Sequence, residues 1–165
     1  MSTASLTSLD FRRALGQFAT GVTVVTVESA PQRVHGMTAN SFTSVSLNPP
    51  LVSVCVDHQA HLLPLIEEKR VFGINVLKEE QQKLSEFFSQ VDQSAREEEQ
   101  LNVRFHWTPE NIPVLDNVLC QVVCRLHSTH IAGDHTIVVG QVLSATLYGG
   151  LPLLFFRGRY TRLLP

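Results

Sequence analysis

The sequence has few cysteines and no long apolar run. Its three cysteines, Cys55, Cys120 and Cys124, have the spacing of neither a disulfide framework nor a C-x-x-C zinc knuckle. No apolar stretch approaches the roughly 20 residues that a membrane-spanning helix requires. The first six residues show neither the basic nor the apolar part of a secretory signal. These absences predict free thiols, no membrane anchor and a cytoplasmic location.

The chain also lacks a surplus of charge and several well-known ligand-binding motifs. Thirteen lysines and arginines against 15 acidic residues give a formal net charge of −2 without a basic stripe, so nucleic acid is not an expected partner. The patterns G-x-G-x-x-G, G-x-x-x-x-G-K-[ST] and G-x-S-x-G are absent, which argues against a Rossmann domain, a P-loop and a hydrolase elbow. The chain has 165 residues, 44% of them hydrophobic. This length and composition predict one domain over 1–165 with an ordered core at about 10–162.

Apolar patterning predicts a mainly β chain with two to four short helices. A first helix, capped by Ser8 and ended by Gly21, would carry an apolar face made of Phe11, Ala14, Leu15 and Phe18. Runs typical of strands lie at 21–27, 34–38, 51–56, 71–77, 118–130, 136–148, 153–156 and 159–161. Helices are expected at 61–69 and 79–88, and a polar, acidic surface segment at 89–102. Because strands and helices do not alternate, the pattern favours an antiparallel barrel with peripheral helices.

Three groups of residues could carry chemistry, and each also has an ordinary structural explanation. In residues 38–46, six of nine side chains bear a hydroxyl or amide, which suits a ring rich in donors and acceptors or a self-bonded loop. His135, after Gly133 and Asp134, could transfer a proton or simply lie solvated in a turn. A zinc site could be formed by Cys120, Cys124, His127 and His130, but buried thiols that pack as small apolar groups explain the cysteines better.

The order and spacing of several blocks give the chain a family resemblance. Residues 18–26 (FATGVTVVT), 36–51 (GMTANSFTSVSLNPPL), 72–77 (FGINVL) and 133–135 (GDH) together resemble the short-chain flavin reductases. These are the reductase components of two-component flavin-dependent monooxygenases. The resemblance implies an FMN-binding split barrel of antiparallel Greek-key type that works as a homodimer. It also implies hydride transfer from NADH or NADPH to FMN or FAD.

The same resemblance assigns roles to individual residues. The flavin would be bound by Thr38, Ala39, Asn40, Ser41, Ser53, Val54, Cys55, Val56, His58, His61, Phe87 and Ser89. Within this set, residues 38–41 would line the isoalloxazine ring, and the stretch around His58 and His61 would reach the phosphate. His135 matches the family histidine near the nicotinamide, and no metal is expected. Residues 58–61 contain no lysine or arginine, so phosphate binding would depend on backbone amides and imidazoles.

Two other functions fit the same fold. One is a flavoprotein that retains its FMN and passes electrons to another acceptor, and the other is a non-catalytic module that binds flavin or haem. The residues decide neither FMN against FAD nor NADH against NADPH.

Overall fold

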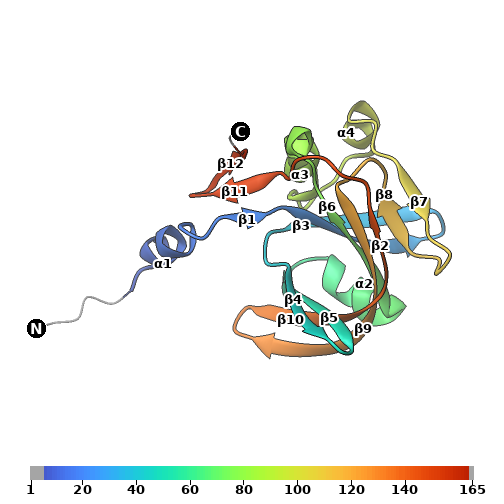
Figure 1. Ribbon diagram of the computed structural model, residues 1–165, viewed down its shortest axis with the longest axis horizontal. Helices are drawn as coiled ribbons and strands as arrows, with labels where there is room; N and C mark the ends of the chain where they lie inside the picture. The colour runs from blue at the N-terminus through green and yellow to red at the C-terminus, as the bar shows by residue number, and fades with distance from the viewer. Residues whose placement is uncertain (1–5, 164–165) are drawn as a thin grey trace, which may run out of the picture.

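The computed structural model describes residues 6–163, in which a curled antiparallel sheet packs with short helices inside and outside its curl (Figure 1). The prediction about residues 1–6 therefore falls almost wholly outside the described residues. The helices are α1 (Ser8–Leu15), α2 (Leu62–Lys69), η1 (Glu79–Gln81), α3 (Gln82–Phe88) and α4 (Ala95–Gln100). The strands are β1 (Thr20–Gly21), β2 (Thr23–Ala30), β3 (Arg33–Ala39), β4 (Thr43–Leu47), β5 (Pro50–Asp57), β6 (Val71–Val76), β7 (Phe105–Trp107), β8 (Pro113–Leu115), β9 (Cys120–Ala132), β10 (His135–Leu147), β11 (Leu154–Phe156) and β12 (Arg159–Thr161).

The main sheet has seven strands, and its two edge strands are neighbours in the sequence. The strand order is β3-β2-β6-β9-β10-β5-β4, and every pair is antiparallel. Edge strand β3 continues into edge strand β4 through residues 40–42 alone. Because three residues reach only about 10 Å, the sheet must curl until its edges approach each other. This confirms the expected antiparallel barrel, open between β3 and the β4–β5 pair.

Strand β2 is buried on both faces, which explains its continuous β-branched composition. Val25 and Val27 point into the barrel, where they pack with the first turns of α2. Val22 and Val24 point outward into a second cluster that includes Phe87 of α3. A strand that is covered on both sides reads as an uninterrupted apolar run, as the sequence does here. Figure 1 shows the two coverings, with α2 inside the curl of the sheet and α3 outside it.

Several local predictions need correction. Helix α1 is capped by Thr7, not Ser8, and ends at Leu15, not at Gly21, so Phe18 lies beyond it. Residues 43–47, most of which belong to the polar stretch expected as a loop or a ring-binding segment, form edge strand β4. The segment at 89–102, expected as a polar surface segment, contains helix α4. The short strands β7 and β8 were not expected. Edge strand β4 and solvated helix α4 have no continuous apolar pattern, and β7 and β8 are only three residues long each, so no sequence pattern indicated them.

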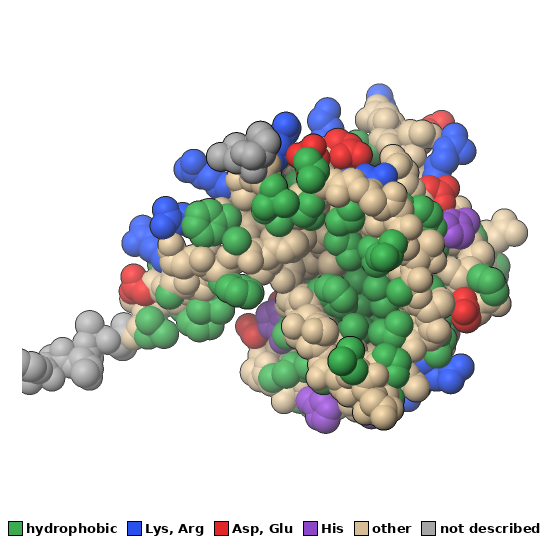
Figure 2. All heavy atoms as spheres, viewed as in Figure 1, with side chains coloured by type: hydrophobic (Ala, Val, Ile, Leu, Met, Phe, Trp, Pro, Cys, Tyr) green, Lys and Arg blue, Asp and Glu red, His purple; other side chains and the backbone are tan. Residues whose placement is uncertain are grey.

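Helix α1 and the strand that follows it form an arm that leaves the body of the molecule (Figure 1). No residue of α1 is buried, although it carries the expected apolar side chains. Phe11 is 51% exposed, Leu15 60% and Phe18 76%. Figure 2 shows these hydrophobic side chains along the arm, and others across the facing surface of the body. Among residues 6–163, none of the helices is long and apolar enough to cross a membrane.

A buried amide fastens three strands on the side of the barrel that α3 covers. Asn75 of β6 is fully buried. Its Nδ2 donates to the carbonyl of Val24 at 2.9 Å and to the hydroxyl of Thr26 at 3.0 Å. Its Oδ1 accepts from the backbone N–H of Leu115 at 2.8 Å. One side chain therefore satisfies polar groups of β2 and β8 that water cannot reach.

We expect Asn75→Ala to lower the free energy of unfolding by about 2–4 kcal/mol, because it leaves buried donors and acceptors without partners. Urea denaturation followed by tryptophan fluorescence measures the change. Gln100→Ala, which removes an exposed amide from α4, is the matched control and should change stability by less than about 0.5 kcal/mol. Equal stability of the two variants would contradict this role for Asn75.

Candidate functional site

The opening of the barrel contains a cavity of about 480 Å³, a size typical of small-molecule sites. Its walls come from β3 and the loop after it, from β5, from the residues just before α2, from the end of α3 and the residues after it, and from the first residue of β10. The lining residues are His35, Gly36, Met37, Thr38, Ala39, Asn40, Ser41, Cys55, Asp57, Gln59, Ala60, His61, Phe88, Ser89, Gln90, Val91, Gln93 and His135. The cavity thus occupies the place where the two sheet edges fail to pair.

Residues 38–41 form one wall, and the fold holds this wall in place. The Thr38 hydroxyl donates to the carbonyl of Ser85 in α3 at 2.6 Å. Ser41 crosses the opening to β5, where its hydroxyl accepts from the backbone N–H of Cys55 at 2.9 Å and donates to the carbonyl of the same residue at 3.3 Å. The carbonyl of Ala39 accepts from Thr23 at 2.7 Å. The wall therefore combines small side chains with fixed polar groups, which suits a flat heteroaromatic ring.

The end of α3 and the residues after it also line the cavity, next to β3. Phe88 lies so close to β3 that a Cβ atom on Gly36 would be 2.6 Å from its ring, so only glycine fits at this position. Gln93 then fastens the following segment, because its Nε2 donates to the carbonyl of Gly36 at 2.6 Å. Ser89, Gln90 and Val91 lie between these two contacts and line the cavity.

His135 lies at the mouth of the cavity in a defined tautomer. Its Nδ1–H donates to the carboxylate of Asp134 at 2.7 Å, and this hydrogen bond lowers the pKa of Asp134. Because a carboxylate accepts only, the proton of the neutral ring is on Nδ1 and Nε2 remains available as an acceptor. His58 stabilises this turn with two hydrogen bonds. Its ring Nε2 bonds to the hydroxyl of Thr136 at 3.1 Å, and its backbone N–H donates to the carbonyl of Asp134.

The other residues assigned by resemblance are divided between cavity and core. Ala39, Cys55, His61 and Ser89 line the cavity with the residues already described. Val54 and Val56 are completely buried in the barrel core, so any contact they make with a ligand would come from their backbone. Phe87 is also a core residue; its neighbour Phe88 belongs to the same buried cluster and also lines the cavity. Ser53 and His58 are not among the lining residues.

Part of the cavity was missed because its residues resemble ordinary strand and surface residues. His35 and Met37 share a face of β3 with Ala39, so the two-residue period of the strand could have indicated them. The rings of His35 and His61 meet edge to face, with 6.1 Å between their centroids. Burial and the neighbouring His61 lower the pKa of His35. Within residues 6–163, no lysine or arginine lines the cavity.

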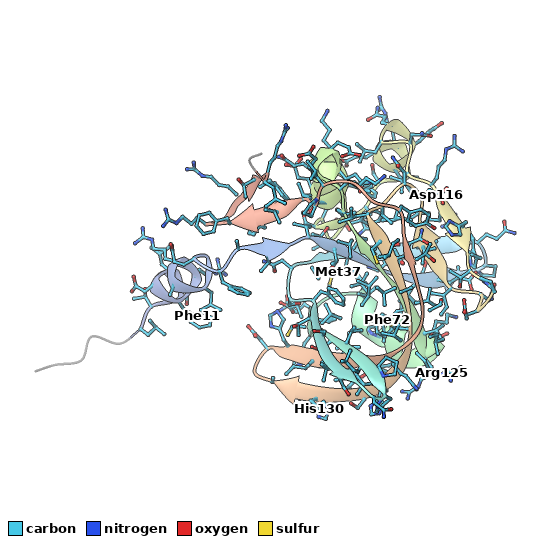
Figure 3. All side chains as sticks on the ribbon, in the orientation of Figure 1. Phe11, Met37, Phe72, Asp116, Arg125 and His130 are labelled. Carbon is cyan, nitrogen blue, oxygen red and sulfur yellow. The ribbon has the colours of Figure 1, made fainter. Side chains whose placement is uncertain are left out.

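The structure does not gather the four candidate zinc ligands. Cys124 lies in the barrel core, where burial raises its pKa to about 12, while His127 and His130 are exposed on β9. Figure 3 places His130 in the β9–β10 hairpin, away from the barrel interior marked by Phe72. Among the described residues, no three His, Cys, Asp or Glu side chains are close enough together to hold a metal ion. The cysteines pack as apolar groups or line the cavity.

Comparisons with known proteins agree with this geometry. The NADH-dependent flavin reductase of a Rhodococcus species is 41% identical over 160 residues, which cover 96% of this chain and 88% of that protein. The reductase component of 4-hydroxyphenylacetate 3-monooxygenase from Thermus thermophilus is 37% identical over 155 residues, covering 93% of this chain and 95% of that one. Both relatives span nearly the whole domain.

A solved structure shows the same architecture. The NADH:FAD oxidoreductase SgcE6 of Streptomyces globisporus, in complex with NAD and FAD fragments, matches with a TM-score of 0.86 at 36% identity, covering 98% of each chain. This match confirms the split-barrel fold that the sequence resemblance implied. The model of the flavin reductase like domain matches residues 15–164. The chain therefore belongs to the flavin reductase like domain family.

Proposed function

We propose that this protein transfers hydride from NADH to a flavin, FMN or FAD, and supplies the reduced flavin to a partner monooxygenase. The observation that carries the proposal is the cavity at the barrel opening, whose ring-sized wall of residues 38–41 faces a histidine of fixed tautomer. The named relatives support it, since they include an NADH-dependent flavin reductase and a monooxygenase reductase component. The flavin supplies the hydride-accepting chemistry, and the protein binds and aligns the two rings.

The lining residues fit a flavin. The hydroxyls and amides of Thr38, Asn40 and Ser41 match the carbonyl and N–H groups at the edge of an isoalloxazine, and the small side chain of Ala39 leaves room against its face. Because Thr38 and Ser41 are anchored to α3 and β5, these groups are oriented before the ligand arrives. Such preorganisation aligns two stacked rings without further ordering of the protein.

His135 is the residue that we assign to the nicotinamide side. It is the first residue of β10 and lines the same cavity as residues 38–41. Asp134 fixes its orientation, so the Nε2 atom can accept a hydrogen bond or, once protonated, donate one. The residue can thus position the second ring or hold a proton beside it. We also propose a cytoplasmic setting, because all three cysteines are free thiols.

The exposed arm and the apolar surface of the body support a homodimer. Helix α1 has eight residues and no buried side chain, whereas isolated helices of that length are marginal in water. Leu147 and Tyr148 at the end of β10 and Leu151 beyond it add further exposed apolar surface. A second copy of the chain can cover both surfaces through one two-fold arrangement, with each arm on the partner's body.

The function itself is tested by adding NADH or NADPH to the purified protein with FMN, FAD or riboflavin and following loss of the reduced nicotinamide. We expect oxidation of NADH that depends on added flavin. A protein that stays yellow through extended dialysis and reduces no free flavin would instead indicate a retained FMN. Tight flavin binding without any NADH oxidation would indicate a non-catalytic module.

We expect His135→Gln to lower kcat with NADH at least tenfold while the Kd for flavin changes less than about twofold, because the residue serves the nicotinamide side. Stopped-flow measurement of flavin reduction separates this step from binding. His127→Gln, at an exposed position of β9, is the control and should keep wild-type rates. Unchanged turnover in the His135 variant would refute its assignment.

Ser41→Ala should raise the Kd for flavin about fivefold, since the loop of residues 40–42 loses both hydrogen bonds to Cys55 and its hold on β5. Quenching of flavin fluorescence on binding measures the Kd. Ser44→Ala removes an exposed hydroxyl from β4 outside the cavity and is expected to bind flavin as the wild type does. The assignment fails if the two serine variants bind flavin equally well.

Charge on the arm should dissociate the dimer. We expect the double variant Phe11→Glu, Leu15→Glu to shift the mass measured by light scattering from twice the chain mass to 18.4 kDa. Arg13→Gln changes the charge of the same helix without touching its apolar face, and this variant should remain dimeric. A wild-type protein that is monomeric at micromolar concentration would contradict the proposed homodimer.

A further inference from the structure

The segment between α3 and α4 separates two hollows. Residues 90–94, here called the strap, lie between these helices and belong to neither a helix nor a strand. Gln90, Val91 and Gln93 line the main cavity of about 480 Å³. Val91, Asp92, Gln93 and Ser94 line a second hollow of about 600 Å³. Because Val91 and Gln93 belong to both linings, the strap forms part of the boundary between the two spaces.

A single hydrogen bond fastens the strap to the main sheet. The Nε2 atom of Gln93 donates to the carbonyl of Gly36 in β3 at 2.6 Å. Within residues 6–163, no other hydrogen bond or ion pair joins residues 90–100 to the main sheet. The remaining hydrogen bonds of this stretch reach only α3 or residues nearby in the sequence. The Gln93 amide is therefore the polar link between the strap and the barrel.

The burial of Gly36 stabilises this link. Gly36 is buried, and β3 is an edge strand with a neighbouring strand on one side only. Removing the donor from a buried carbonyl costs free energy, because the carbonyl has already given up its hydrogen bonds to water. The bond from Gln93 therefore favours the arrangement in which the strap lies against β3.

The strap and α4 bury few side chains that could hold them in place without this bond. Val91 is 73% exposed, and α4 has no buried residue. Segments that bury few apolar side chains open locally at low cost in free energy while the rest of the protein stays folded. We therefore expect the loss of the Gln93 hydrogen bond to change how often the strap opens.

Opening of the strap would change the shape of the site. The main cavity and the second hollow share His35, His61, Val91 and Gln93. Movement of the two strap residues away from β3 would join the hollows into one trench beside the histidines. A segment that closes over a site holds the ligands in place, and its opening lets them exchange.

We propose that Gln93 is a positioning residue that latches the strap against β3, and that flavin enters and leaves the cavity while this latch is open. The inference rests on the proposed function and adds the step that controls how fast flavin is exchanged. The latch joins two groups of the protein, so it stabilises the closed strap equally with and without flavin. Its loss should therefore raise the rates of entry and exit together and leave the affinity nearly unchanged.

The test compares the wild type with Gln93→Met, which keeps the length of the side chain but removes the donor. Gln100→Met is the matched control, because Gln100 is exposed on α4 and lines neither hollow. Stopped-flow measurement of flavin fluorescence gives kon and koff. We expect both to rise about fivefold in Gln93→Met, the effect of one lost hydrogen bond, with the Kd within about twofold of the wild type. The control should match the wild type in both.

Limited proteolysis tests the latch without any ligand. Arg96 is an exposed residue of α4, and trypsin can cleave after it only when the segment opens. When opening and closing are fast compared with cleavage, the rate of cleavage follows the open population. Cleavage after Arg96 should therefore be about fivefold faster in Gln93→Met and unchanged in Gln100→Met.

A second variant keeps the proposal falsifiable if Gln93→Met does not fold. Gln93→Glu has the same shape, and its carboxylate cannot donate, so it should raise kon, koff and cleavage in the same way. An increase in koff and Kd without an increase in kon would show that Gln93 binds flavin directly and would overturn the latch. Wild-type rates of exchange and cleavage in both Gln93 variants would also overturn it. In contrast, flavin exchange that accelerates as expected in a protein that oxidises no NADH would refute the proposed reductase activity alone.

Discussion

The site depends on one constraint of the chain: the two edges of the main sheet are joined by only three residues. Because residues 40–42 connect β3 to β4, the sheet has to curl until its edges meet, yet no backbone ladder joins β3 to β5 within the described residues. The unpaired opening becomes the cavity. Ser41 takes the place of the missing ladder, since its hydroxyl both accepts from and donates to the backbone of Cys55. The binding wall is therefore part of the closure of the barrel, which is the reason such short polar side chains can be held rigidly.

The outer layer fixes the same wall from behind. Ser85 of α3 is fully buried; its carbonyl accepts from Thr38, and its hydroxyl shares a 2.9 Å hydrogen bond with Tyr160 of β12. Phe88 fills the space that Gly36 leaves open. A displacement of α3 would thus move both walls of the cavity together. The C-terminal hairpin, although distant in sequence, is connected to this wall of the cavity through the hydrogen bonds of a single serine.

The sequence predicted the elements that have a regular apolar pattern, and it missed those whose structure depends on contacts with other elements. β2, β6, β9 and β10 are rich in β-branched residues, and these strands were predicted within a few residues. β4 has a polar sequence because it is an edge, and α4 has an acidic one because it is solvated. Residues 38–41 and His135, to which the family resemblance assigns roles, all line the cavity. The resemblance could not separate Cys55 from Val54 and Val56, because only the register of β5 decides which side chains face the opening.

The contact between His35 and His61 could not be predicted from the sequence. A lone histidine in a strand carries no sequence signal, and its partner, His61, is 26 positions away in another element. Only the fold brings the rings within 6.1 Å, where burial together with His61 lowers the pKa of His35. Because none of the lysines and arginines of residues 6–163 lines the cavity, its polar groups are hydroxyls, amides, imidazoles, a thiol and the carboxylate of Asp57. An anionic ligand would therefore have to be held there without a permanent cation.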